Sequence, residues 1–236
     1  MLIPGMLVED HFAKYCTSLG VWTGIEEFPI YVPGSATLLK YKSRFYMICT
    51  KHQLSQTENL ESVCLLTSGD ADQTKCITSE GARWFDRSED GDYQQIVAFE
   101  YTDACKRIPS LQSMFFDFRG EHPDIVVESI VAFITYGYPT SETDIDFEKR
   151  KIRQSRLRIL SHFTRPGSDD SLHVIDPIRP LPFDPDGLSG GPTFCVTMER
   201  PGEYIAHFSG VTVRGGRSRL MLIKAGAVQA MLDSFN

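Results

Sequence analysis

The most informative part of the sequence is the stretch Asp184-Pro185-Asp186-Gly187-Leu188-Ser189-Gly190-Gly191-Pro192. Glycines surround its serine, with Gly187 two residues before Ser189 and Gly190-Gly191 directly after it. A serine nucleophile needs an exposed Oγ and backbone N–H groups aimed at the oxyanion that develops on the substrate. Glycine lets the backbone turn sharply and approach a substrate without a Cβ in the way. The stretch therefore predicts a nucleophile at Ser189, although a tight turn between two strands would use the same glycines.

Outward from this stretch, the chain consists of short apolar runs separated by turn residues. Residues 36–41 and 45–50 flank Lys42-Ser43-Arg44 and predict a hairpin. Further strands are expected at residues 62–67, 96–101, 125–135, 156–163, 172–175, 193–198, 204–213 and 220–223. A short helix is expected within 9–19 and another over 225–235, where the apolar residues share one face. This spacing of strands is typical of an all-β sandwich or barrel.

Composition excludes several classes of protein. The 236 residues are 42% hydrophobic and carry a net charge of −7, so a protein that binds nucleic acid through phosphates is not expected. No apolar run is long enough to span a bilayer, and the first residues lack a basic segment followed by an apolar one, as a signal peptide would have. The six cysteines form no C-x-x-C pair, which argues against a zinc site and favours reduced thiols in the cytoplasm.

The Ser189 stretch closely resembles the nucleophile motif of the trypsin-like serine peptidases, the chymotrypsin-fold family. In that family the catalytic residues follow the order His, Asp, Ser. His52 ends an apolar strand in Cys49-Thr50-Lys51-His52, which resembles the family's general-base motif Thr-Ala-x-His. The resemblance implies that His52 takes the proton from Ser189 as general base. His207, the sole histidine after Ser189, would fit only an α/β-hydrolase order of residues, and no strand–Ser–helix pattern supports that fold.

The third catalytic residue is where the match to the family weakens. Family members carry an Asp directly before a strand, whereas Gln95 precedes Ile96 here. Asp92, three residues earlier, would supply the carboxylate if the loop brings it to His52. Gln95 would otherwise orient His52 without supplying charge, and such a change from acid to amide costs roughly 10⁴ in turnover. A third possibility is a protein that has lost activity and kept the fold.

The resemblance also assigns the oxyanion hole and bears on activation. The backbone N–H groups of Gly187 and Ser189 would hold the oxyanion. Leu188 stands where secreted members that are activated by cleavage carry an Asp that pairs with the new N-terminus. Activation by N-terminal cleavage is therefore not expected, and the resemblance points to the intracellular branch of the family.

Substrate preference is harder to derive. The residues that the resemblance puts in the substrate pocket are Phe183 at its floor and Val213, Arg214 and Gly215 along its wall. A phenylalanine floor argues against Lys or Arg as the preferred substrate residue, because those side chains need an acid. Arg214 would accept an acidic side chain or point to solvent. A shifted loop would bring Asp184 or Asp186 into the pocket instead.

The resemblance implies a peptidase domain of two antiparallel six-stranded β-barrels with a C-terminal helix. The N-terminal barrel, residues 31–118, would carry His52 and the acid, and the C-terminal barrel, residues 119–236, would carry Ser189. Residues 1–30 would form an N-terminal extension. The function expected is a serine endopeptidase with a covalent acyl-enzyme and without metal or cofactor, acting on a peptide or protein. The alternative is a weakened or inactive module that binds a peptide along a strand edge.

One basic segment remains outside this interpretation. Residues 149–158 hold six Lys or Arg residues and no acid. They would suit an acidic partner or RNA. A solvated strand or loop, balanced by the acids that precede it, explains the segment as well, and the acidic balance of the whole chain favours that interpretation.

Overall fold

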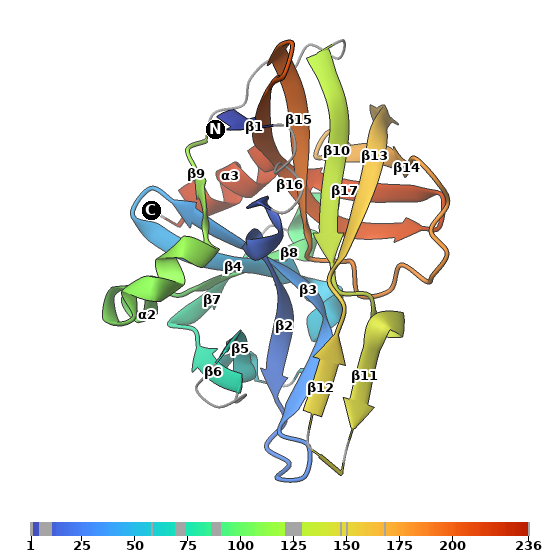
Figure 1. Ribbon diagram of the computed structural model, residues 1–236. Helices are drawn as coiled ribbons and strands as arrows, with labels where there is room; N and C mark the ends of the chain where they lie inside the picture. Colours follow the sequence, from blue (N-terminus) through green and yellow to red (C-terminus); the bar gives the residue numbers. More distant parts are fainter. Residues whose placement is uncertain are drawn as a thin grey trace.

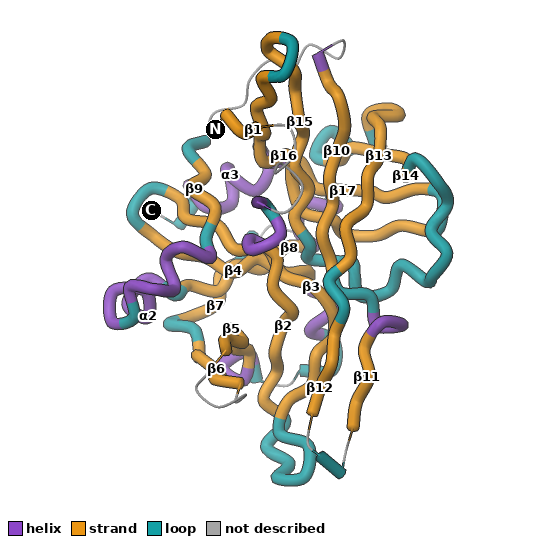
Figure 2. Tube along the Cα trace, viewed as in Figure 1, coloured by secondary structure: helices purple, strands orange, loops and turns teal. Residues whose placement is uncertain are grey.

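The computed structural model describes residues 2–4, 11–57, 59–68, 74–85, 91–120, 129–146, 148–149, 151–167 and 169–235. Two β-structures lie side by side, and strands make up most of the tube in Figure 2 (Figures 1 and 2). The predicted two-barrel, mostly antiparallel architecture with a C-terminal helix is confirmed. The expected strand at 125–135 falls partly outside the described residues.

The second half of the chain forms a closed barrel. Its strands are β10 (Ile130–Gly137), β13 (Leu157–Pro166), β14 (Leu172–Pro177), β15 (Pro192–Arg200), β16 (Glu203–Gly216) and β17 (Arg219–Lys224). The barrel closes because β17 pairs with both β14 and β16. Strand β1 (Leu2–Pro4), from the other end of the chain, adds to β16. The predicted six strands of this barrel are all present.

The first half forms a more open sheet than expected. Its strands are β2 (Cys16–Trp22), β3 (Ile30–Tyr41), β4 (Arg44–Thr50), β5 (Val63–Ser68), β6 (Thr74–Thr78), β7 (Gly81–Arg83), β8 (Ile96–Glu100) and β9 (Phe116–Phe118). They follow the order β6-β5-β2-β3-β4-β8-β7, with β9 parallel to β3. Within the described residues β6 and β7 do not pair with each other, so the sheet is a half-barrel with two edges.

The segment expected as an N-terminal extension contributes a strand to this sheet. Of the helix expected within 9–19, residues 9 and 10 lie outside the described residues, Ala13–Tyr15 form a 3-10 turn, and Cys16–Trp22 form β2 between β3 and β5. Residues 16–21 are all buried, so both faces of β2 meet protein. A strand buried on both faces lacks the alternation that reveals a half-buried strand, which explains why the sequence pattern wrongly placed residues 16–19 in a helix.

Side chains from both halves form a common core. Tyr46 and Ile48 of the first sheet share one apolar cluster with Ile134 and Phe194 of the second barrel. Helix α3 (Ala225–Asp233) joins this cluster, as the predicted apolar face requires. Because the cluster crosses from one half to the other, burial of apolar surface holds the two halves together.

The remaining elements are short. Helix α2 (Thr102–Arg107) follows β8, and β11 (Thr143–Asp146) and β12 (Lys151–Gln154) form a hairpin beside β2 and β3 (Figure 1). Short 3-10 turns lie at Ala13–Tyr15, Lys51–Leu54, Leu60–Ser62, Asp92–Gln95, Pro109–Met114 and Thr140–Glu142. Among the described residues no helix has the length and apolar character needed to cross a membrane.

Candidate active site

Ser189 lies in the loop between β14 and β15 of the second barrel. Its side chain is half-buried, and its Oγ donates a hydrogen bond to the carbonyl oxygen of Val213 on β16 at 3.0 Å. Leu188, the residue before it, is 1% exposed and packs in an apolar cluster of the second barrel. The loop is therefore anchored on both sides of the serine by contacts with its own barrel.

Two glycines make the tight path of this loop possible. Gly187 has a φ of 91° and Gly190 a φ of 84°, a left-handed conformation that L-residues with a Cβ rarely adopt. A Cβ on Gly190 would overlap the carbonyl oxygen of Ser35, and one on Gly187 would overlap that of Tyr138. The glycines that flank Ser189 in the sequence thus serve both the turn and the close approach of neighbouring chains.

The N–H groups expected to hold an oxyanion are those of Gly187 and Ser189. Within the described residues neither the Gly187 N–H nor the Ser189 N–H has a hydrogen-bond partner. The carbonyl of Asp186 accepts from the Thr140 N–H at 2.8 Å, and the carbonyl of Leu188 accepts from the Gly191 N–H at 3.0 Å. In a trans peptide the N–H points opposite to its carbonyl, so these bonds turn both N–H groups away from the loop's own contacts.

His52 lies in the 3-10 turn Lys51–Leu54 that follows β4. Its side chain is at the surface, and its Nε2 lies 3.3 Å from Thr50 Oγ1. Protein atoms around the ring lower the pKa of the imidazole below its ordinary value, and the negative charge of Asp186 opposes this shift. The ring is therefore mostly neutral near pH 7, which is the form that a general base requires.

Three side chains of the first half hold the Ser189 loop in place. Gln53 Nε2 donates to the carbonyls of Ser35 at 3.0 Å and Ser189 at 2.9 Å. Ser35 Oγ donates to the Gly187 carbonyl at 2.6 Å, and Thr37 Oγ1 donates to the Gly190 carbonyl at 2.7 Å. Because all three donors come from the first half, the two halves fix the loop geometry jointly.

No motif in the sequence marks these three residues as part of the site. Ser35 and Thr37 are fully buried in the apolar run of β3, and Gln53 follows His52 directly and is 6% exposed. Buried polar side chains need partners, so a hydroxyl inside an apolar strand is a weak signal of such a contact. The sequence does not reveal that the partner lies about 150 residues further along the chain.

The two candidates for the acid, Asp92 and Gln95, do not contact His52 through hydrogen bonds in the described structure. The carboxylate of Asp92 forms an ion pair with Arg214 at 2.6 Å, across the two halves. Gln95 is exposed at the end of the same 3-10 turn, Asp92–Gln95. Among the described residues no hydrogen bond joins His52 to Asp92, Gln95 or Ser189. The charge that Asp92 was expected to lend to His52 is directed at Arg214 instead.

The residues expected around the substrate take several roles. Phe183 packs on the apolar cluster that contains Leu188, and Gly215 pairs with Leu220. Pairing of β15 with β16 ends at Val211, so in the described structure residues 214–216 pair only with β17. The other edge of this part of β16 therefore has no strand partner and lies beside Ser189. Arg214, which forms the ion pair with Asp92, belongs to this edge.

The described residues contain no group of three or more His, Cys, Asp or Glu side chains that could hold a metal ion. The arrangement offers a hydroxyl, a neutral imidazole, two unpartnered N–H groups and an open strand edge. Acyl transfer through the serine uses these groups and does not need a metal.

No family model and no curated protein matches the chain. Among solved structures, the human heparin binding protein is similar in fold, with a TM-score of 0.58 over 95% of this chain and 92% of that one. The two sequences are 8% identical over the match, so the similarity concerns the fold. That neighbour has the chymotrypsin fold, which agrees with the two-barrel architecture described above.

Proposed function

We propose that the chain is a serine endopeptidase in which Ser189 attacks the scissile carbonyl and His52 accepts its proton. The N–H groups of Gly187 and Ser189 would hold the oxyanion of the tetrahedral intermediate. That neither N–H group has a hydrogen-bond partner among the described residues is the observation that carries the proposal, because a loop that only linked two strands would have no need of two free donors. When the intermediate collapses, the peptide bond breaks and protonated His52 gives its proton to the leaving amine, which forms the acyl-enzyme. Water, deprotonated by His52, then hydrolyses the Ser189 ester and restores the free serine.

The open edge of β16 supports a peptide as the substrate. An extended peptide can pair with the backbone of residues 214–216, which would present its carbonyl to Ser189. Ser189 Oγ must leave the Val213 carbonyl and turn to His52 before attack. Catalytic hydrogen bonds are often long or absent without substrate and form when substrate binds.

The buried Leu188 supports an enzyme that needs no cleavage to become active. Its side chain is anchored in an apolar cluster, and no new charged terminus could pair with it. This property agrees with the proposed intracellular branch of the family, and the cytoplasmic location stays a prediction from sequence.

The contact between Asp92 and Arg214 favours a second candidate function. With Asp92 engaged at 2.6 Å and an amide at position 95, no carboxylate among the described residues forms a hydrogen bond with His52. A module that binds a peptide at the β16 edge without cleaving it would have this arrangement. The two candidates differ in whether Ser189 reacts.

Labelling with a fluorophosphonate probe separates the candidates. We expect the wild-type protein to be labelled and the Ser189→Ala and His52→Ala variants not to be, since both groups are needed for attack on the probe. Ser113→Ala is the control, because Ser113 is an exposed serine outside the site that bonds only the Ser110 carbonyl. An unlabelled wild-type protein with intact folding would reject the peptidase and leave the binding module.

The same assay tests the acid. If Asp92 leaves Arg214 to orient His52 during the reaction, Asp92→Asn should slow labelling by orders of magnitude. Gln95→Ala would have that effect if the amide orients the ring instead. Equal rates for both variants and the wild type would mean that His52 works without a third residue.

A further inference from the structure

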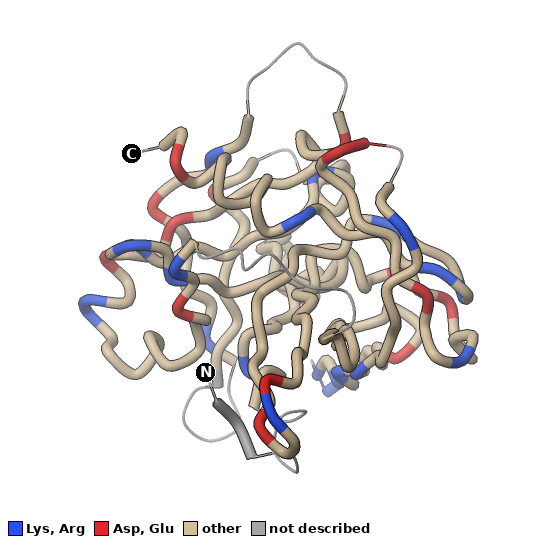
Figure 3. The backbone as a smooth tube through the Cα atoms, turned by 90° about the horizontal axis from the view of Figure 1, so that it is seen from above, with Lys and Arg blue, Asp and Glu red and all other residues tan. Residues whose placement is uncertain are grey.

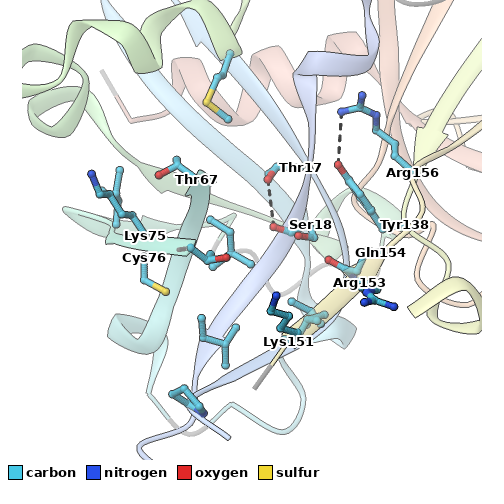
Figure 4. A pocket seen from close by; sticks show the side chains of 18 of the residues that line it. Thr17, Ser18, Thr67, Lys75, Cys76, Tyr138, Lys151, Arg153, Gln154 and Arg156 are labelled. Atoms are coloured by element: carbon cyan, nitrogen blue, oxygen red, sulfur yellow. Dashed lines mark hydrogen bonds between the residues drawn. The ribbon is translucent and has the colours of Figure 1, made fainter. Parts of the chain in front are cut away.

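A large groove lies outside the site described above. Its volume is about 1780 Å³, and neither Ser189 nor His52 lines it. Residues 16–18 of β2 lie between its two sides, with β5 and β6 on one side and β12 on the other (Figure 4). Tyr138, which also lines it, donates its N–H to Ser35 Oγ, so the groove adjoins the loop contacts of the candidate active site.

The groove exists because β2 and β5 separate. The two strands pair only where Leu19, Gly20 and Val21 face residues 63–65. Beyond that point residues 16–18 pair with β3 alone in the described structure, and Leu66 and Thr67 of β5 line the groove. The first sheet therefore opens at this point and leaves a hollow that the β11–β12 hairpin borders.

The lining has the opposite charge to the protein as a whole. Six Lys or Arg residues and two acids line the groove, in a chain with a net charge of −7. One acid, Asp146, is neutralised by an ion pair with Lys149. Lys14, Lys151 and Arg156 form no ion pair with a carboxylate of the described residues. Along most of the backbone, Lys and Arg positions alternate with Asp and Glu positions (Figure 3). The groove is therefore suited to an anionic occupant.

Strand β12 also offers this occupant unpaired backbone groups. All four residues of β12 line the groove, whereas only Asp146 of β11 does. In the described chain β12 pairs with β11 alone, so its second edge faces the groove unpaired. Such an edge presents a row of backbone N–H and C=O groups that another strand can pair with.

Apolar side chains complete the lining. Leu66, Ile77 and Ile152 are half-buried and face the groove between the charged groups. In an extended peptide successive side chains point in opposite directions. One set would contact these apolar side chains while the other set meets the Lys and Arg side chains.

We propose that the groove binds an extended acidic peptide segment of a partner protein, which adds as a third strand to the free edge of β12. This inference does not depend on catalysis by Ser189. A sulfated polysaccharide would use the cations but has no backbone to pair with β12. Single-stranded nucleic acid would need aromatic platforms for its bases, and the aromatic residues of the lining, Phe28 and Tyr138, are only partly exposed.

Fluorescence anisotropy with a labelled peptide of alternating Glu and Val tests the charge requirement. The experiment uses the full chain carrying Ser189→Ala, so that cleavage does not interfere. Combining Lys151→Glu with Arg153→Glu should weaken binding about tenfold or more, because two attractive contacts become repulsive. The matched control combines Arg179→Glu with Arg200→Glu, two exposed residues outside the groove. Equal weakening in both pairs, or no binding by the parent protein, would overturn the proposal.

Two N-methylated forms of the same peptide test strand pairing. Alternate residues of a strand direct their N–H groups to opposite sides, so methylation of one alternating set removes the bonds to β12 and methylation of the other does not. We expect one form to bind like the parent peptide and the other at least about tenfold more weakly. Equal binding of both forms, or dextran sulfate binding at the groove more tightly than the peptide, would refute strand addition and indicate a polyanion site.

Discussion

Gln53→Leu should destabilise the protein by about 4 kcal/mol. The Gln53 side chain donates to the carbonyls of Ser35 and Ser189 and accepts from the N–H and Oγ1 of Thr50 at 2.8 Å each. Leucine has a similar volume but satisfies none of these groups. Each lost hydrogen bond to a buried group costs about 1 kcal/mol, which gives the total for four.

Urea unfolding followed by tryptophan fluorescence measures this loss, with the slope against urea expected to stay unchanged. Gln112→Leu is the control, because Gln112 is exposed and its side chain donates a single hydrogen bond, to the Cys105 carbonyl at 3.0 Å. It should cost less than about 1 kcal/mol. A loss of stability in Gln53→Leu no larger than that of the control would refute the view that Gln53 connects the two halves. Fluorophosphonate labelling should also slow, since the Ser189 carbonyl loses its anchor.

Three further predictions concern the site and its support. Asp186→Asn should move the acidic limb of the pH–activity profile to lower pH, because the Asp186 carboxylate raises the pKa of His52; an unmoved limb would contradict this. Burial lowers the pKa of His173 to about 4, so the unfolded chain takes up a proton at this histidine between pH ~7 and ~5 while the folded chain does not, and the free energy of unfolding falls by about 2 kcal/mol. His173→Phe should remove most of this pH dependence, which thermal unfolding at the two pH values measures. Gly190→Ala should cost about 3 kcal/mol from its positive φ and the overlap with a neighbouring carbonyl, whereas the control Gly202→Ala, with a φ of 85° and open space, should cost about 1 kcal/mol in urea unfolding.

Local patterns in the sequence predict the fold well. The β3–β4 hairpin and the six strands of the second barrel follow apolar runs bounded by turn residues, and helix α3 follows its apolar face. The local pattern does not predict the secondary structure of a segment that the tertiary fold buries on both faces, such as β2. The sequence also does not predict that β6 and β7 stay unpaired with each other, since closure of a sheet depends on how all of its strands are arranged in space.

The candidate site shows the same division. Gly187 and Gly190 predict a tight turn around Ser189, which the structure has, and His52 directly follows strand β4 as expected. The partner of Asp92 could not be foreseen, because Arg214 lies 122 residues away in sequence and meets it only when the halves pack. An ion pair between distant residues leaves no periodicity or spacing in the sequence.

The hydrogen bonds from Ser35, Thr37 and Gln53 to the Ser189 loop bear on how the protein unfolds. A loop held by donors from the other half keeps its conformation only while both halves are folded and in contact. Local opening of the first sheet would therefore release the loop before the second barrel unfolds. We expect the hydrogen-bonded amides of Leu188, Gly190 and Gly191 to exchange with solvent at the rate set by the first half, although the carbonyls that accept from them belong to the second.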